Sequence, residues 1–145
     1  MAIDPAIREN QERAEQEAKA LTNKVILVVD DSPTVRKIVK VTLAKIGCRV
    51  IMAEDGLEAL AKIEDEKPDL ILLDIMMPHL DGYQVCSLIK KNPHYKHVPV
   101  VMLSGKDGFF DKVRGRLVGS TDYITKPFQP HVVTETVEKH LIDHG

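Results

Sequence analysis

Leu70-Ile71-Leu72-Leu73-Asp74-Ile75-Met76-Met77-Pro78 is the stretch that decides the fold of this 145-residue chain. Four consecutive apolar residues are typical of a strand that is buried on both faces, and such strands belong to parallel sheets covered by helices. A carboxylate, Asp74, ends the run. The carboxyl ends of strands in open α/β sheets are where ligands bind. We therefore take Asp74 as the candidate reactive group.

The same pattern of apolar runs and helical periodicity continues on both sides of this strand. The other expected strands cover residues 24–29, 49–53, 98–103 and 121–125. Helices are expected after Pro33, after Asp55 and after Asp81, and at about 109–117 and 132–142, and Gly47 ends the first of them. Strands and helices alternate five times over short connections. This alternation predicts an α/β fold with a parallel sheet and helices on both faces.

Residues 1–23 differ in character from the rest of the chain. They are polar and favour a helix, with Asp4 as a candidate N-cap and Pro5 in the first turn. Their apolar residues are too sparse for a core stripe. We expect a solvated helical or flexible N-terminal extension, with a docking or dimerisation helix as the alternative, and a main domain over 24–145.

Composition limits the class of protein. The length suits one domain, and a net charge of −2 gives no electrostatic case for nucleic acid or an anionic membrane as partner. No apolar stretch approaches membrane-spanning length, and charges occupy the N-terminus, so a cytoplasmic protein is expected. Cys48 and Cys86 are expected to be reduced, half-buried thiols. His140 and His144 lack a third ligand for a transition metal.

Polar side chains follow four of the expected strands. Asp30 and Asp31 end the first, Asp74 the third, Ser104 the fourth and Lys126 the fifth. Since parallel strands share their carboxyl edge, these groups converge, and clustered carboxylates repel unless a cation lies among them. All-oxygen ligation favours Mg²⁺. With a lysine and a hydroxyl beside it, the site suits phosphoryl transfer to a carboxylate.

These residues also carry a family resemblance, over roughly 24–142. The motifs are Asp30-Asp31, Leu72-Leu73-Asp74-Ile75-Met76-Met77-Pro78-x-x-Asp81-Gly82, Leu103-Ser104 and Tyr123-x-x-Lys126-Pro127-Phe128. The chain resembles the receiver domain of two-component response regulators. Residues 81–90, 102–112 and 115–120 are similar to stand-alone PilG-type receivers of type IV pilus chemosensory systems. The resemblance implies a flavodoxin-like, doubly wound (βα)5 sandwich with strand order 2-1-3-4-5.

The resemblance also implies how the metal and the phosphoryl group are held. Asp74 would be the phosphoacceptor and would receive its phosphoryl group from a phosphohistidine of a CheA-like histidine kinase. Asp31, Asp74 and the backbone carbonyl of Met76 would ligate Mg²⁺, and Asp30 would act through a metal-bound water. Ser104 and Lys126 would bind phosphoryl oxygens.

A conformational switch follows from the same resemblance. Tyr123 would be the switch aromatic, and Lys126-Pro127 would be a cis peptide. Phosphorylation would draw Ser104 inward and vacate space for Tyr123, so the surface beside it changes shape. The candidate partner contacts on that surface are Phe109, Phe110, Lys112, Arg114 and Arg116; ordinary packing is the alternative for either Phe.

Output and turnover can also be anticipated. A downstream protein target and a monomer or weak dimer are expected. A DNA-binding output is not expected, because no residues follow Gly145 for a helix-turn-helix domain. Catalysis would be limited to the chain's own phosphorylation and dephosphorylation. Met76 cannot assist an attacking water, so self-dephosphorylation should be slow, although Lys106 is long enough to reach the phosphoryl group.

Two alternatives remain open at this point. An aspartate-nucleophile small-molecule phosphatase uses the same residue types, but such enzymes have Asp-x-Asp after the first strand. Here Asp30 and Asp31 are adjacent, Met76 replaces the second carboxylate after Asp74, and no insertion is long enough to enclose a substrate. The other alternative is an interaction module that works without phosphorylation.

Overall fold

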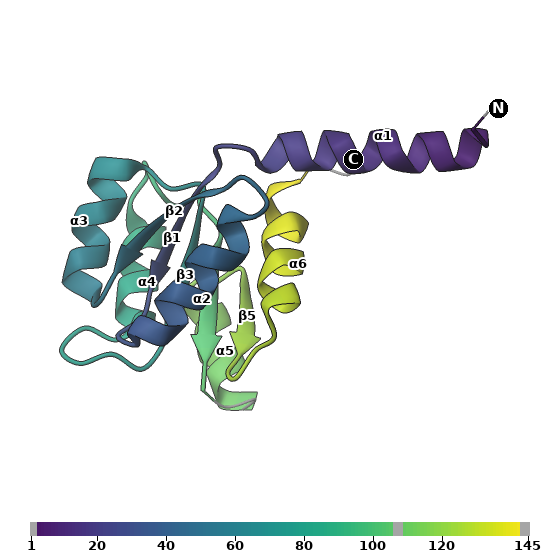
Figure 1. Ribbon diagram of the computed structural model, residues 1–145. Coiled ribbons are helices and arrows are strands. Elements are labelled where there is room, and N and C mark those ends of the chain that lie inside the picture. Colours follow the sequence, from purple (N-terminus) through teal and green to yellow (C-terminus); the bar gives the residue numbers. More distant parts are fainter. Residues whose placement is uncertain (1–2, 106–108, 143–145) are drawn as a thin grey trace.

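The computed structural model describes residues 3–105 and 109–142 and confirms the predicted fold (Figure 1). Five parallel strands form one sheet in the order β2-β1-β3-β4-β5. The elements in chain order are α1 (Pro5–Leu21), β1 (Val25–Val29), α2 (Pro33–Ala44), β2 (Arg49–Ala53), α3 (Gly56–Glu66), β3 (Leu70–Asp74), α4 (Gly82–Lys91), β4 (Val100–Ser104), α5 (Phe109–Leu117), β5 (Asp122–Thr125) and α6 (Pro130–Leu141).

Two of the differences between the expected and the observed element boundaries follow from the chemistry of proline. β4 begins at Val100 rather than Val98, because Pro99 has no N–H for the ladder and the Val98 N–H donates to the Tyr95 carbonyl in a turn. Helix α6 begins two residues earlier than expected, at Pro130. The fixed φ of proline suits the first helical position, where an N–H would lack a partner in any case.

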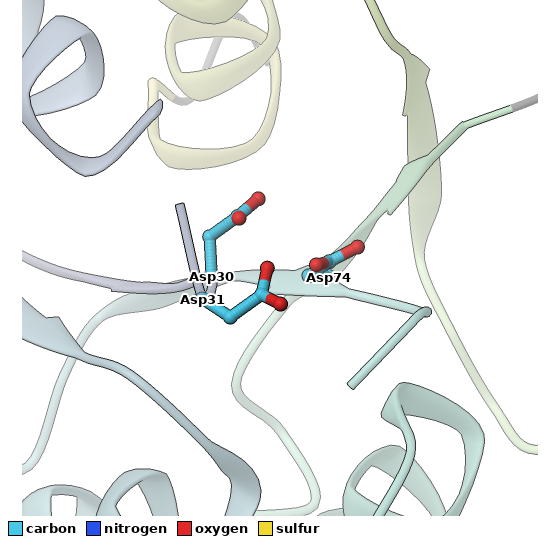
Figure 2. Close-up of side chains that lie close together, drawn as sticks. All are labelled: Asp30, Asp31 and Asp74. Atoms are coloured by element: carbon cyan, nitrogen blue, oxygen red, sulfur yellow. The ribbon is translucent and has the colours of Figure 1, made fainter. Parts of the chain in front are cut away.

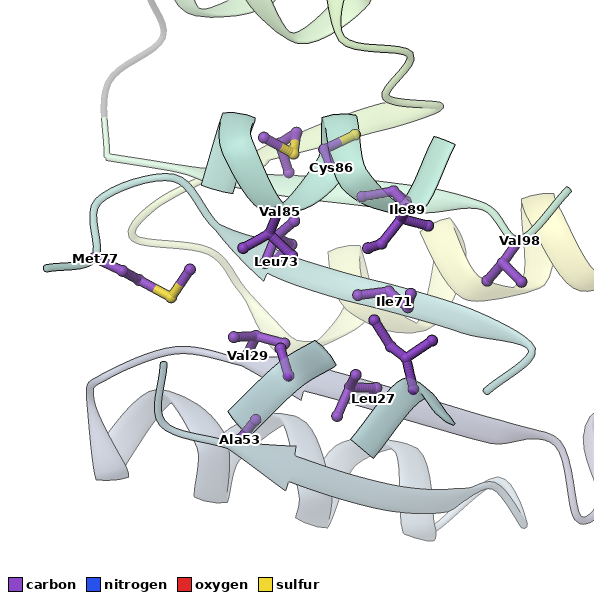
Figure 3. Packing of buried hydrophobic residues seen from close by; sticks show 14 of the residues in the cluster. Leu27, Val29, Ala53, Ile71, Leu73, Met77, Val85, Cys86, Ile89 and Val98 are labelled. Atoms are coloured by element: carbon purple, nitrogen blue, oxygen red, sulfur yellow. The ribbon is translucent and has the colours of Figure 1, made fainter. Parts of the chain in front are cut away.

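The core lies on both faces of the sheet, as the apolar run in β3 predicted. Alternate residues of the central strands point to opposite sides: Ile71 and Leu73 pack with α3 and α4, whereas Leu70 and Leu72 pack with α2 and α6. Figure 3 shows the first of these two clusters around β3 and α4. Every residue of β3 is buried, so the position of Asp74 is fixed by packing on both sides.

Helix α1 begins as predicted and projects from the body of the molecule (Figure 1). Asp4 accepts a hydrogen bond from the Ala6 N–H at 2.9 Å, and Pro5 is the first helical residue. Ile7 is half exposed, but Leu21, in the last turn, is buried against the α2 and α6 side of the core. The last turn of α1 is therefore anchored, while its first turns extend into solvent.

The two cysteines are free thiols and lie deeper than expected. Both are buried, with Cys86 fully enclosed. Burial raises the pKa of Cys48 and raises that of Cys86 to about 11, so neither thiol is a ready nucleophile at neutral pH. Within the described residues, no helix is long and apolar enough to cross a membrane.

Candidate functional site at the carboxyl ends of the strands

Three aspartates and a lysine meet at the carboxyl edge of the sheet, and we call Asp30, Asp31, Asp74 and Lys126 the acidic pocket. Carboxylate oxygens of the three aspartates lie within 4.8 Å of one another (Figure 2). Lys126 Nζ lies 2.5 Å from Asp30 Oδ2 and 3.3 Å from Asp74 Oδ1. Asp30 and Asp74 are buried, whereas Asp31 is exposed. The structure thus brings together three segments that are far apart in sequence: Asp30-Asp31, Asp74 and Lys126.

Opposing effects set the charges in the acidic pocket. Burial raises the pKa of Asp74 above its usual value, the neighbouring Asp30 raises it further, and Lys126 and the Met76 N–H only partly offset this. Burial by itself lowers the pKa of Lys126, but the hydrogen bond and charge of Asp30, with a contribution from Asp74, outweigh it and raise the pKa. Lys126 therefore stays charged, and the pocket holds more negative charge than one lysine neutralises.

Local hydrogen bonds hold Asp30 in place. The Ser32 N–H donates to Asp30 Oδ1 at 2.9 Å, and Arg36 Nη1 donates to the Asp30 carbonyl at 2.6 Å. Arg36 was not predicted from the sequence as part of the site. Its position six residues after Asp30, in the first turns of the following helix, was the available signal.

Gly82 explains the Asp81-Gly82 part of the motif. The Gly82 N–H donates to the Ile75 carbonyl at 3.0 Å, so the start of α4 lies directly against the end of β3. A Cβ at this position would collide with the Asp74 carbonyl oxygen and lie 2.8 Å from Ile75 Cα. Asp81 caps the helix in a capping box with Gln84. A side chain at 82 would displace the segment that carries the candidate phosphoacceptor.

The donor set of the acidic pocket fits a hard divalent cation. The clustered donors are all carboxylate oxygens, which is the chemistry Mg²⁺ prefers, and the excess negative charge favours a cation. Met76 contacts the acidic pocket through its backbone: its N–H donates to Asp74 Oδ1 at 3.2 Å, while its side chain is exposed. The Met76 carbonyl as a ligand and the water-mediated role of Asp30 stay predictions.

Ser104 and Tyr123 lie beside the acidic pocket, around a separate cavity. The Ser104 hydroxyl is buried at the end of β4 and donates to Asp111 Oδ2 at 3.1 Å. Tyr123 is 38% exposed on β5. Both residues line a cavity of about 90 Å³ between β4, α5 and β5, together with Asp111 and Gly115. The Lys126-Pro127 peptide is cis, as expected.

The surface built by α5, β5 and α6 (residues 109–117, 122–125 and 130–141), which we call the switch face, carries the predicted partner contacts Lys112 and Arg116, whereas Arg114 packs toward α4. Lys112 Nζ lies 4.6 Å from the centroid of the Tyr123 ring. Arg114 lies 4.3 Å from the centroid of the Tyr83 ring, and Arg116 lines the cavity. The predicted contacts of the Phe109 and Phe110 side chains lie outside the described residues.

Two polar residues near Ser104, Asp111 and Tyr83, were not predicted from the sequence. Asp111 accepts hydrogen bonds from both Ser104 and Tyr83, and Tyr83 is 6% exposed. Asp111 is seven residues after Ser104, in the first turn of the next helix. That spacing was the only signal, because the direction of α5 depends on tertiary packing.

Fold and site together define an α/β protein of the flavodoxin-like class whose central strands end in an acidic pocket with a lysine beside it. The chain belongs to the response regulator receiver family: the model of the response regulator receiver domain matches residues 26–138. The resemblance seen in the motifs is thereby confirmed.

Relatives and solved structures agree with this assignment. The chain is 53% identical over 116 residues to the protein PilG of Pseudomonas aeruginosa, covering 80% of this chain and 86% of PilG. It is 47% identical to the alkaline phosphatase synthesis transcriptional regulatory protein PhoP of Bacillus subtilis, covering 82% of this chain but only 49% of PhoP. The structure of the chemotaxis response regulator CheY4 of Vibrio cholerae matches with a TM-score of 0.79 at 35% identity, over 83% of this chain and all of CheY4.

Proposed function

We propose that this receiver stores a signal as a phosphoryl group on Asp74, delivered by a histidine kinase. The observation that supports this most strongly is the acidic pocket itself. Asp74 is buried at the end of a central strand, with Lys126 Nζ 3.3 Å from its Oδ1 and two further carboxylates within 4.8 Å. A nucleophile, a fixed cation and a set of metal donors are the parts that phosphoryl transfer requires.

In this proposal an oxygen of Asp74 forms the bond to phosphorus while the bond from phosphorus to the histidine nitrogen of the donor breaks. Mg²⁺, held by Asp31 and Asp74 and through water by Asp30, would neutralise charge on the transferred group. Lys126, already paired with Asp30 and Asp74, would take a phosphoryl oxygen as an additional partner. These residues would thus catalyse only the phosphorylation and dephosphorylation of the chain itself.

The switch face would carry the signal to a partner. The cavity beside Ser104 and Tyr123 supports a two-position switch, because it offers space next to an aromatic ring that is exposed in this structure. Phosphorylation would recruit the Ser104 hydroxyl and let Tyr123 turn inward, and a downstream protein would read the altered surface. Lys112, Arg114 and Arg116 are the proposed contacts.

Similarity to PilG supports a place in a chemosensory relay that controls type IV pili, with a CheA-like kinase as phosphodonor. The proposed receiver spans residues 24–145, and residues 1–23 form the extension that precedes it. A cytoplasmic location and a monomer or weak dimer complete the proposal.

Labelling by acetyl phosphate tests the proposed function. With Mg²⁺ present, intact-mass spectrometry should show one phosphoryl group per chain, and no label after chelation or in Asp74→Asn. Asp65→Asn, an exposed aspartate on α3, is the matched control and should label like the wild type. Absence of label in the wild type contradicts the proposal. Sustained turnover of p-nitrophenyl phosphate would favour the phosphatase alternative instead.

A further inference from the structure

The carboxylate of Asp111 joins three elements of the fold. It accepts the Ser104 hydroxyl from the end of β4 through Oδ2, and the Tyr83 hydroxyl from α4 through Oδ1, each at 3.1 Å. Both donors are almost completely buried, with 2% of Ser104 and 6% of Tyr83 exposed. Two oxygens of one carboxylate on α5 are therefore occupied by two hydroxyls that the core holds in place.

Tyr83 serves as a hydrogen-bond donor to Asp111. Burial, the hydrogen bond to Asp111 and its charge raise the pKa of Tyr83 to about 12, although Arg114 opposes the shift. The Tyr83 hydroxyl thus stays protonated and available as a donor at neutral pH. Arg114, stacked 4.3 Å from the ring centroid, covers the ring from the α5 side.

This arrangement conflicts with the role of Ser104 in the phosphorylated state. A hydroxyl carries one proton and can donate it to one acceptor at a time. A phosphoryl oxygen on Asp74 would need the proton that Ser104 now donates to Asp111. Hydrogen bonds to charged acceptors are the stronger ones, so Asp111 is a competitor of comparable chemistry.

We propose that Asp111 is an autoinhibitory latch that holds the Ser104 hydroxyl toward α5 until a phosphoryl group outcompetes it. The inference rests on the proposed function of Asp74 and names how that site is regulated. Asp111 acts as a positioning residue, since it works through Ser104. Asp111, Ser104 and Tyr123 line the same cavity, so the latch lies beside the space that an inward Tyr123 would use.

Beryllofluoride, an analogue of the phosphoryl group, measures the competition directly. We would titrate the full chain with BeF₃⁻ in the presence of Mg²⁺ and follow binding by calorimetry and by backbone amide NMR. Asp111→Ala removes both acceptors and should tighten BeF₃⁻ binding about three- to tenfold, the range expected for one hydrogen bond. Asp111→Asn keeps the shape and one acceptor without the charge, and should fall between Asp111→Ala and the wild type.

A double-mutant cycle separates a latch from a merely structural role. In a Ser104→Ala background, which binds BeF₃⁻ more weakly, Asp111→Ala should give no gain, because no hydroxyl remains to be released. Tyr83→Phe removes one anchor of Asp111 and should tighten binding by about twofold or less, a fraction of one hydrogen bond. Tyr95→Phe, which deletes a hydrogen bond to Glu64 away from the site, is the matched control and should leave binding unchanged.

The outcomes distinguish the latch from the proposed function. If the wild type binds BeF₃⁻ and is labelled, but Asp111→Ala and Asp111→Asn bind no more tightly, the latch is wrong and the phosphoacceptor stands. An equal gain with and without Ser104 also overturns the latch, because the effect then does not pass through the hydroxyl. A wild type that neither binds BeF₃⁻ nor accepts phosphate overturns both. If Asp111→Ala does not fold, BeF₃⁻ binding by Asp111→Asn and Tyr83→Phe still tests the latch.

Discussion

The acidic pocket and the switch face lie side by side in the sheet but are built differently. The aspartates of the acidic pocket follow the central strands β1 and β3, where Asp30 is fully buried and Asp74 is 3% exposed. The switch face includes the edge strand β5, where Tyr123 is 38% exposed and Lys112 Nζ lies over its ring. One region is packed from both sides, and the other has space beside it.

This difference matches the work each region has to do. Phosphoryl transfer requires groups held in fixed geometry, and central strands that are buried throughout provide this. A switch requires two arrangements of similar free energy, which a packed core does not offer. An edge strand beside a cavity, with exposed side chains, can adopt two such arrangements. We therefore expect equivalent substitutions to lower the free energy of unfolding much more in the acidic pocket than on the switch face.

Adding one methyl group to a glycine in each region tests this prediction most strongly. Gly82→Ala places a Cβ against the backbone of Asp74 and Ile75, which cannot move without disturbing β3, and should lower the free energy of unfolding by about 3 kcal/mol. In Gly115→Ala, on α5, the close neighbour is the Ser120 hydroxyl, which can rotate away. That variant should stay within about 0.5 kcal/mol of the wild type, since alanine also favours the helix. Urea unfolding measures both.

The same two variants should differ in function. Gly82→Ala should lose most acetyl phosphate labelling, because it displaces the candidate phosphoacceptor, whereas Gly115→Ala should label normally. Similar stability losses in the two variants would contradict the contrast between a fixed and an adaptable region.

Removal of the lysine cation is expected to have the next largest effect. Lys126→Met leaves Asp30 and Asp74 buried without their partner, and should cost about 2 kcal/mol at neutral pH in Mg²⁺-free buffer, less than a fully buried pair because Lys126 is 22% exposed. Lys40→Met, on the exposed side of α2, is the control and should change stability by less than about 0.5 kcal/mol.

Magnesium sharpens this test. Since a bound divalent cation would replace the missing charge, Mg²⁺ should raise the unfolding midpoint of Lys126→Met more than that of the wild type. Equal Mg²⁺ effects on Lys126→Met and the wild type would argue against a metal site among these carboxylates.

The central strands were predictable from sequence because burial on both faces leaves a continuous apolar run, as in Leu70 to Leu73. The members of the acidic pocket were predictable for a related reason: parallel strands share one edge, so residues that follow them converge. Asp111, Tyr83 and Arg36 were not predicted, because their contacts depend on how helices are oriented on the sheet. The apolar run that marks a buried strand is a local feature of the sequence, whereas helix orientation comes from packing between distant segments.

The smallest expected effect concerns the base of the switch face. Asp122, at the start of β5, has its Oδ2 2.8 Å from His140 Nε2 and 3.5 Å from Lys139 Nζ on α6. Burial alone would raise the pKa of Asp122, but the His140 hydrogen bond, the Tyr123 N–H and the Lys139 charge together lower it. Asp122→Asn should therefore cost about 1 kcal/mol at neutral pH.

The pH dependence of this cost shows whether the charge of Asp122 is what stabilises β5 against α6. Because the pKa is lowered in the folded state, the stabilisation is complete above the usual aspartate pKa and is lost as pH falls through the folded-state value. The stability difference between wild type and Asp122→Asn should thus be present at neutral pH and vanish in acid. Glu135→Gln, exposed on the same helix, should show no such difference. A difference that persists in acid would assign the effect to packing, and the base of the switch face would then be as rigidly packed as the acidic pocket.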